Sequence, residues 1–214
     1  MEAPSHVVFG LAGAVVADSV FHITGTQLIG QPLGNPHQVA DVLLLKIIYF
    51  GCAALGALTP DIDNARSTIG RRAGFVSKGI QALAGHRTIF HSLFGLVMVG
   101  AFVWGAQYAL GHALYNWGFV QAGEALGAGV ATGGVIAAGR QVAFIAFLVG
   151  YLLHIIADGL TLGGVPLLWP NHYRFGFPPE RRWRFRTGSR MEFVVVTAVA
   201  VTVIVLIYLG KLHI

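Results

Sequence analysis

Long apolar runs alternate with short polar segments along this chain. Four runs approach or exceed the roughly 20 residues that a helix needs to span a bilayer: residues 42–59, 89–110, 141–160 and 193–212. A fifth run, residues 6–23, is shorter and contains Asp18, so we expect it to span at a tilt or to pack inside the bundle. The pattern predicts an all-α fold: a polytopic membrane helical bundle with about five transmembrane helices.

One further apolar stretch, residues 120–138, is rich in Gly and Ala. We expect it to form a re-entrant or extramembrane segment rather than a sixth span. The composition is typical of a membrane protein, because hydrophobic residues make up 55% and charged residues only 11%, against about 25% charged residues in soluble domains. Mean hydropathy is +0.69. Since no second domain is visible, residues 1–214 are expected to form a single membrane-embedded domain.

Basic residues gather in two segments between the expected spans. Of the 14 Lys and Arg residues, 11 lie between the second and third spans or between the fourth and fifth. Cytoplasmic loops carry an excess of Lys and Arg, so we expect a multi-pass protein of the cell inner membrane with both segments and the N-terminus in the cytoplasm. This placement explains the net charge of +5 without a nucleic-acid partner. The single cysteine, Cys52, excludes an intrachain disulfide framework.

Histidines and carboxylates fall at the cytoplasmic ends of the expected spans. His154 and Asp158 are four residues apart and project from one helix face, and the alternation in Asp61-Ile62-Asp63 suits an extended turn. Ionisable groups near the hydrocarbon are costly unless they are paired, hydrated or metal-bound. The candidate metal ligands that share this depth are His6, Asp61, Asp63, His86, His91, His154 and Asp158.

Each signal alone has a simpler explanation. A single histidine in a membrane helix is usually a hydrogen-bonded packing residue, an Asp-x-Asp pair can cap a loop, and His154 can form an intrahelical hydrogen bond with Asp158. Their convergence on one face favours a metal site. Asp18 lies too far along the first span and is expected to be structural. The histidines that fall outside the set are His22, His37, His112, His172 and His213.

Four runs in this sequence resemble the YdjM-like family of inner-membrane proteins. They are GALTPDIDNARSTIGRR (56–72), GHRTIFHSLFG (85–95), GYLLHIIADGLTLGGVPLLWP (150–170) and TGSRMEF (187–193). The family pattern reads PDIDH where this chain has Asn64, so a ligand role at that position does not carry over, while Asp61 and Asp63 match. Members of the family are described as metal-dependent hydrolases, and the resemblance implies that activity here.

Mixed His and carboxylate ligands suit a divalent transition metal such as Zn²⁺, Mn²⁺ or Fe²⁺, as one ion or more. For catalysis we expect Asp158 or Glu192 to accept a proton and Arg87 to hold a negative substrate oxygen. A site at headgroup depth lined by arginines favours a lipid-like substrate bearing phosphate, with soluble esters or amides left open. Two rival classes stand beside the hydrolase: a membrane scaffold or regulatory protein with a structural metal, and a divalent-metal transporter.

Overall fold

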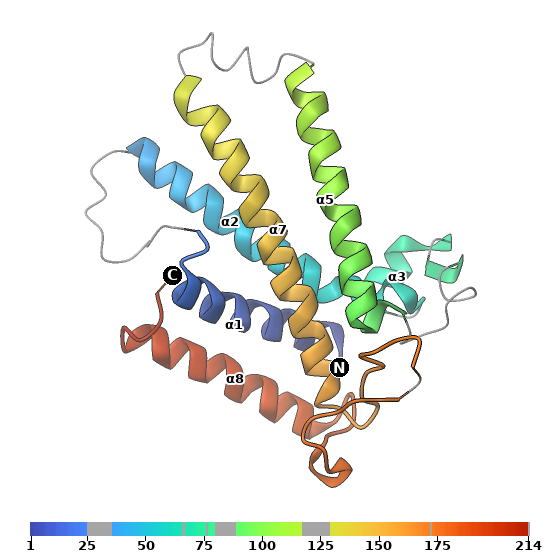
Figure 1. Cartoon of the computed structure of the whole chain (residues 1–214). Coiled ribbons are helices and arrows are strands. Elements are labelled where there is room, and N and C mark those ends of the chain that lie inside the picture. Colours follow the sequence, from blue (N-terminus) through green and yellow to red (C-terminus); the bar gives the residue numbers. More distant parts are fainter. Residues whose placement is uncertain are drawn as a thin grey trace.

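The structure of the protein is a computed structural model that describes residues 1–24, 36–65, 67–75, 77–79, 89–116, 129–171 and 173–213. Five long helices dominate it (Figure 1): α1 (Ala3–Phe21), α2 (Pro36–Leu58), α5 (Leu93–Asn116), α7 (Gly129–Gly159) and α8 (Arg190–Tyr208). The short elements are η1 (Thr59–Asp63), α3 (Thr68–Ala73), η2 (Ile89–His91) and η4 (Arg181–Trp183). Within these residues, extended pairing is confined to two isolated bridges, so the predicted all-α class is confirmed.

Five helices are long and apolar enough to cross a bilayer, as predicted. Their spans are Ala3–Phe21, Val42–Asp63, Leu93–Leu114, Gly139–Gly159 and Arg190–Tyr208. Residues 129–138 form the first part of α7, since adding residues to an existing helix costs little once it has nucleated. The candidate span within α7 begins at Gly139, so these residues form no sixth span, as expected. Residues 120–128 lie outside the described part.

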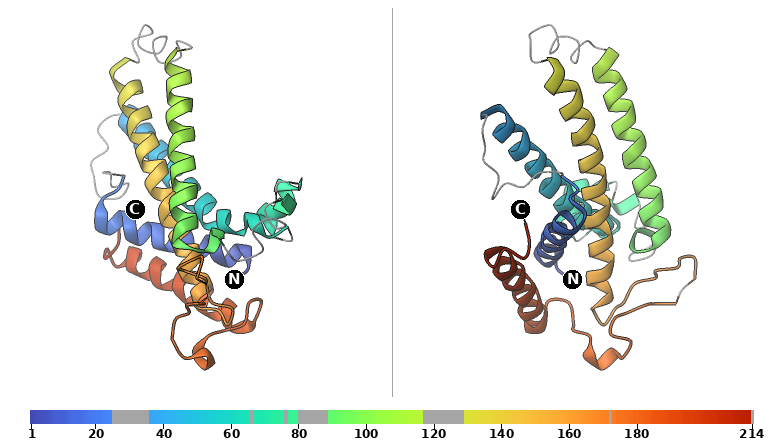
Figure 2. Two further views of the ribbon diagram at one scale, coloured as in Figure 1. Left: turned by 45° about the vertical axis from the view of Figure 1, so that its right-hand side comes forward. Right: turned by 60° about the vertical axis from the view of Figure 1, so that its left-hand side comes forward.

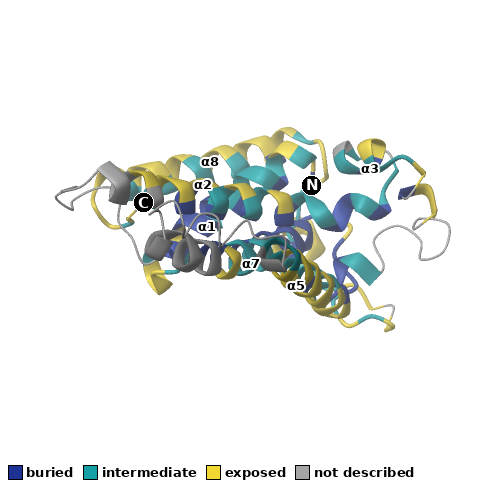
Figure 3. Ribbon diagram, turned by 90° about the horizontal axis from the view of Figure 1, so that it is seen from above, coloured by how far each residue is buried: buried dark blue, intermediate teal, exposed yellow. Residues whose placement is uncertain are grey.

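Glycines let α2 and α7 approach closely. A Cβ added to Gly56 would lie 2.0 Å from the carbonyl oxygen of Phe147, and one added to Gly150 would lie 1.9 Å from that of Ala53. The adjoining core is built from small and aromatic side chains, among them Ala53 and the fully buried Tyr49. Seen from above, buried residues follow α1, α2 and α7, whereas α5 and α8 carry much of the exposed apolar surface (Figure 3). Small residues at such contacts are typical of membrane bundles.

A side chain caps the start of α8 near the cluster of polar residues. The Ser189 side chain accepts a hydrogen bond from the backbone of Glu192 at the start of α8. Pro60 occupies the first turn of η1, where its missing N–H costs nothing. The turn after α2 is therefore a 3-10 helix that continues the chain direction, and the prediction of an extended turn over residues 61–63 was wrong. As a result, both aspartates of η1 are buried.

A buried ion pair joins α1 to α2. The Lys46 ammonium lies 2.5 Å from Asp18 Oδ2, and each side chain is only 4% exposed. Thr24 adds two hydrogen bonds to the same carboxylate, from its backbone N–H at 2.8 Å and its hydroxyl at 3.1 Å. The expected structural role of Asp18 is confirmed, and this pair fixes the register of α1 against α2.

Candidate metal centre

Six of the seven predicted metal ligands come together where four elements converge. The meeting point lies at the C-terminal part of α7, beside the starts of α1 and α8 (Figures 1 and 2). α1 supplies His6, η1 supplies Asp61 and Asp63, η2 supplies His91, and α7 supplies His154 and Asp158. All six residues are buried. The seventh predicted ligand, His86, lies outside the described residues, as does the predicted substrate-binding Arg87.

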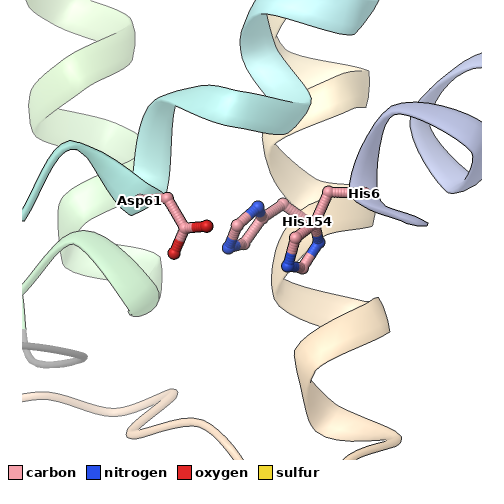
Figure 4. A group of neighbouring side chains, drawn as sticks. All are labelled: His6, Asp61 and His154. Atoms are coloured by element: carbon pink, nitrogen blue, oxygen red, sulfur yellow. The ribbon is translucent and has the colours of Figure 1, made fainter. Parts of the chain in front are cut away.

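The six side chains form three overlapping groups of potential ligands. The groups are His6 with Asp61 and His154, His91 with His154 and Asp158, and Asp61 with Asp63 and His91. Within each group the ligand atoms lie within 4.8 Å of one another. Each pair of groups shares one residue, which is an arrangement suited to more than one ion with bridging ligands. Figure 4 shows the first group, with His154 between Asp61 and His6.

The contacts within this set are close. Asp158 Oδ1 lies 3.3 Å from His6 Nε2, and Asp158 Oδ2 lies 3.5 Å from His91 Nε2 and 3.9 Å from His154 Nε2. His91 Nε2 is also 3.7 Å from Asp61 Oδ1. The N-terminal ammonium of Met1 pairs with Asp158 Oδ1. Asp158 therefore stands at the centre of the set, with one oxygen toward α1 and the other toward the two remaining histidines.

A backbone carbonyl fixes the protonation of His154. Its Nδ1 lies 2.6 Å from the carbonyl oxygen of Ala57, which can only accept, so Nδ1 carries the hydrogen. In the neutral ring Nε2 then presents its lone pair to the cluster, where it lies 3.2 Å from His91 Nε2. A ring N–H held by a carbonyl is the usual support for a metal-bound histidine. The sequence gives no side-chain signal for this contact, because the acceptor belongs to the backbone.

The surroundings of the His6 side chain bear on whether these residues fit a metal ion. Its ring stacks on that of His154 with centroids 3.6 Å apart, and it is fully buried. Neither ring nitrogen of His6 makes a hydrogen bond with a described residue, although Nε2 is close to Asp158. A buried polar atom without a partner costs about 1–3 kcal/mol. The His6 nitrogens lack hydrogen bonds and lie close to Asp158 and Asp61, an environment that fits a divalent cation.

His91 lies between two aspartates, just before the α5 span. Its Nδ1 is 3.4 Å from Asp63 Oδ2, and Asp61 lies on the Nε2 side. Burial alone would lower the pKa of His91, but the facing carboxylates of Asp61 and Asp63 and the nearby charge of Asp158 outweigh it and raise the pKa to about 9. Without a bound ion, His91 is therefore protonated at neutral pH and can donate to His154 Nε2.

Glu192, the other predicted proton acceptor, lies outside the three groups. Its two carboxylate oxygens accept hydrogen bonds from the backbone N–H groups of Glu2 at 2.8 Å and Gly188 at 2.9 Å. These contacts join the start of α1 to the start of α8. The geometry therefore favours a structural role for Glu192, and its part as a general base stays a prediction.

Comparisons with known proteins agree on one family. The family model described as YdjM inner membrane protein matches residues 1–214. Over 131 residues the chain is 37% identical to Inner membrane protein YdjM of Escherichia coli (strain K12) and to the protein of the same name from Shigella flexneri. These matches cover 59% of this chain and 51% of each relative, so the chain spans about half of their length.

A more distant relative comes from a different bacterium. Uncharacterized protein YvsG of Bacillus subtilis (strain 168) is 27% identical over 150 residues, which cover 70% of this chain and 71% of that protein. No solved structure matches the chain.

Proposed function

This chain belongs to the YdjM family of inner membrane proteins, and we propose that it is a metal-dependent hydrolase of that membrane. The observation that carries the proposal is the set of six buried His and Asp side chains, gathered from four elements into three overlapping ligand groups. Burying three carboxylates together is unfavourable unless cations compensate them. Because burying these charged side chains is unfavourable and four separate elements hold them together, the site points to a functional role.

The proposed ligands are His6, Asp61, Asp63, His91, His154 and Asp158. A mixed imidazole and carboxylate set without thiolate suits Zn²⁺, Mn²⁺ or Fe²⁺. When bound, such an ion acts as a Lewis acid and activates water for hydrolysis. The residues of the chain orient one another: the Ala57 carbonyl holds His154 by Nδ1, and Asp63 faces Nδ1 of His91.

Asp158 is the proposed proton acceptor. Its carboxylate lies within 3.9 Å of three histidines, so it can exchange a proton with them over a short distance. The side chain of Asp61 is 10% exposed, so Asp61 is the residue of this set that a substrate can reach from outside. We place substrate entry on that side. Arg87 is proposed to hold a negative substrate oxygen on the basis of its sequence position alone.

The proposed substrate is lipid-like and carries a phosphate or ester bond. Exposed arginines support this, because Arg71 and Arg72 lie on α3, the helix that comes after η1 in the chain. Guanidinium groups bind phosphate oxygens in paired hydrogen bonds. The excess of basic residues in the two segments that flank the site supports a cytoplasmic location for the site and for the N-terminus.

A second candidate is a scaffold or regulatory protein with a structural metal. The burial of all six ligands favours it, since a structural site is closed and a catalytic site keeps one position open. A divalent-metal transporter fits less well, because transport sites lie near the bilayer midplane. Here the ligands gather at the end of the α7 span.

Metal analysis of the purified protein tests the proposal. We expect bound transition metal in the wild type and its loss in His154→Ala and Asp61→Asn. His112→Ala is the matched control, because it removes an exposed histidine of α5 outside the set. Hydrolysis is then assayed with phospholipids and a generic phosphodiester. Wild-type protein free of metal would refute the metal centre. Metal without hydrolysis of any of these substrates would favour the structural role instead.

A further inference from the structure

A second polar site lies between α5 and α7, away from the metal centre. It is a pocket of about 380 Å³. Arg140 lies at the start of the α7 span, whereas His154 lies near its end. The 14 residues between them correspond to about 21 Å of helix. The pocket therefore lies near the opposite end of the α7 span and is separate from the proposed hydrolytic site. The residues of this pocket that carry the argument are Trp104, Gln107, Tyr108, Arg140, Gln141 and Phe144.

Each polar side chain of the pocket can donate a hydrogen bond, and no carboxylate is among the described residues that line it. Arg140 makes no ion pair with any residue that the structure describes. A Cβ placed on Gly111 would lie 2.6 Å from a terminal nitrogen of Arg140. The guanidinium thus reaches across from α7 to α5 and occupies room that a larger side chain would close. Gln107 and Gln141 contribute amide groups and Tyr108 a hydroxyl.

The apolar part of the pocket is aromatic. The rings of Trp104 and Phe144 meet edge to face, with centroids 5.0 Å apart and planes at 65°. Trp104 is 51% exposed and Tyr108 is 61% exposed, so both rings face the surroundings of the bundle. Trp and Tyr collect where acyl chains meet headgroups, because each ring has an apolar body and a polar edge.

We propose that this pocket binds an anionic phospholipid. The phosphate would accept hydrogen bonds from Arg140 and the neighbouring amide and hydroxyl groups, since guanidinium and phosphate pair strongly. The acyl chains would lie against Trp104 and Phe144. Since no described residue neutralises Arg140, its positive charge favours a negative headgroup over a zwitterionic one. This site stands independently of the hydrolase proposal.

Lipid retention tests this proposal. The protein is purified from bilayers of equal parts phosphatidylglycerol and phosphatidylcholine, and retained lipid is measured by native mass spectrometry. We expect phosphatidylglycerol to be retained preferentially, by roughly tenfold if one charge-assisted contact is decisive. Arg140→Gln should abolish that preference. Lys211→Gln is the matched control, because it removes an exposed basic residue near the end of α8 and should keep the preference.

Gln141→Leu separates an effect on lipid binding from a loss of folding, since it removes one hydrogen-bond donor of the pocket and leaves the charge of Arg140 in place. We expect it to weaken the preference by a smaller factor, with the helical content of each variant checked by circular dichroism. Equal retention of both lipids by the wild type would refute the proposal, as would an unchanged preference in Arg140→Gln. Displacement of the lipid by millimolar inorganic phosphate would also refute it, because the pocket would then take a free anion.

Discussion

The buried pair Asp18–Lys46 gives a sharp prediction about how α1 is held against α2. Lys46→Met keeps the length and apolar stem of the side chain but removes its charge. The change leaves the Asp18 carboxylate buried at 4% exposure without its counter-ion. We expect the variant to be destabilised, because an ionised carboxylate in such a position is compensated only by its partners.

The size of the effect follows from the contacts of Asp18. Breaking one side of a buried ion pair costs about 3–5 kcal/mol. Thr24 would still donate two hydrogen bonds to the carboxylate, so the lower end of that range applies here. In a protein of this size, 1 kcal/mol shifts the unfolding temperature by about 2–4 °C. A loss of about 3 kcal/mol therefore corresponds to a decrease of about 6–12 °C.

Thermal unfolding in detergent, followed by circular dichroism, measures this decrease. The double variant Asp18→Asn/Lys46→Met removes both charges and should recover most of the loss, to within about 1 kcal/mol, because replacing both partners is nearly neutral. Lys211→Met serves as the control, since it changes an exposed lysine. A Lys46→Met variant that unfolds at the wild-type temperature would refute the reasoning, and so would a double variant no more stable than Lys46→Met.

Two further predictions concern the metal centre and the helix packing that supports it. The pKa of His91 is raised to about 9, so below that pH a metal ion must displace a proton from His91. The apparent metal affinity should therefore fall about tenfold per pH unit from pH 9 to pH 6. A metal titration that is independent of pH would contradict this. Gly150→Ala places a Cβ 1.9 Å from the carbonyl oxygen of Ala53 and should destabilise by about 1–3 kcal/mol. Gly51→Ala is the control: its added Cβ would have nothing within 4 Å, so this variant should not be destabilised. Equal unfolding temperatures for the two variants would show that α2 and α7 can move apart without loss of stability.

Much of the fold follows from the apolar runs, because a span length and a polar interruption are properties of the sequence alone. The helix boundaries were less predictable. α7 begins at Gly129 rather than near residue 141, since Gly and Ala lower mean hydropathy without preventing a helix from continuing. The expected start of the third span at residue 89 also differed, because residues 89–91 form η2 and the Ser92 hydroxyl accepts from the backbone of Gly95 at the first turn of α5.

The set of candidate ligands was predictable because charged groups are rare in an apolar chain and each one requires an explanation. The depth of each ionisable residue along its expected span was enough to select six residues whose side chains come together in the structure. Their supports were not predictable, since the Ala57 carbonyl and the Phe90 carbonyl, which accepts from Tyr151 at 2.7 Å, belong to the backbone. The pocket at Arg140 was not predictable for a related reason: its shape depends on Gly111, which belongs to another helix.

The charge of the ligand set bears on how many ions it holds. Three ionised aspartates and three neutral histidines carry a total of −3, and the Met1 ammonium that pairs with Asp158 brings the set to −2. One divalent ion would make the set neutral, which gives no attraction for an anionic substrate. Two ions would leave it at +2, which attracts an anionic substrate and matches the shared ligands of the overlapping groups. Electrostatics in a buried site are strong enough for this sign to matter. We therefore expect two ions per chain, and a stoichiometry of one would favour the structural metal over the phosphate-directed hydrolase.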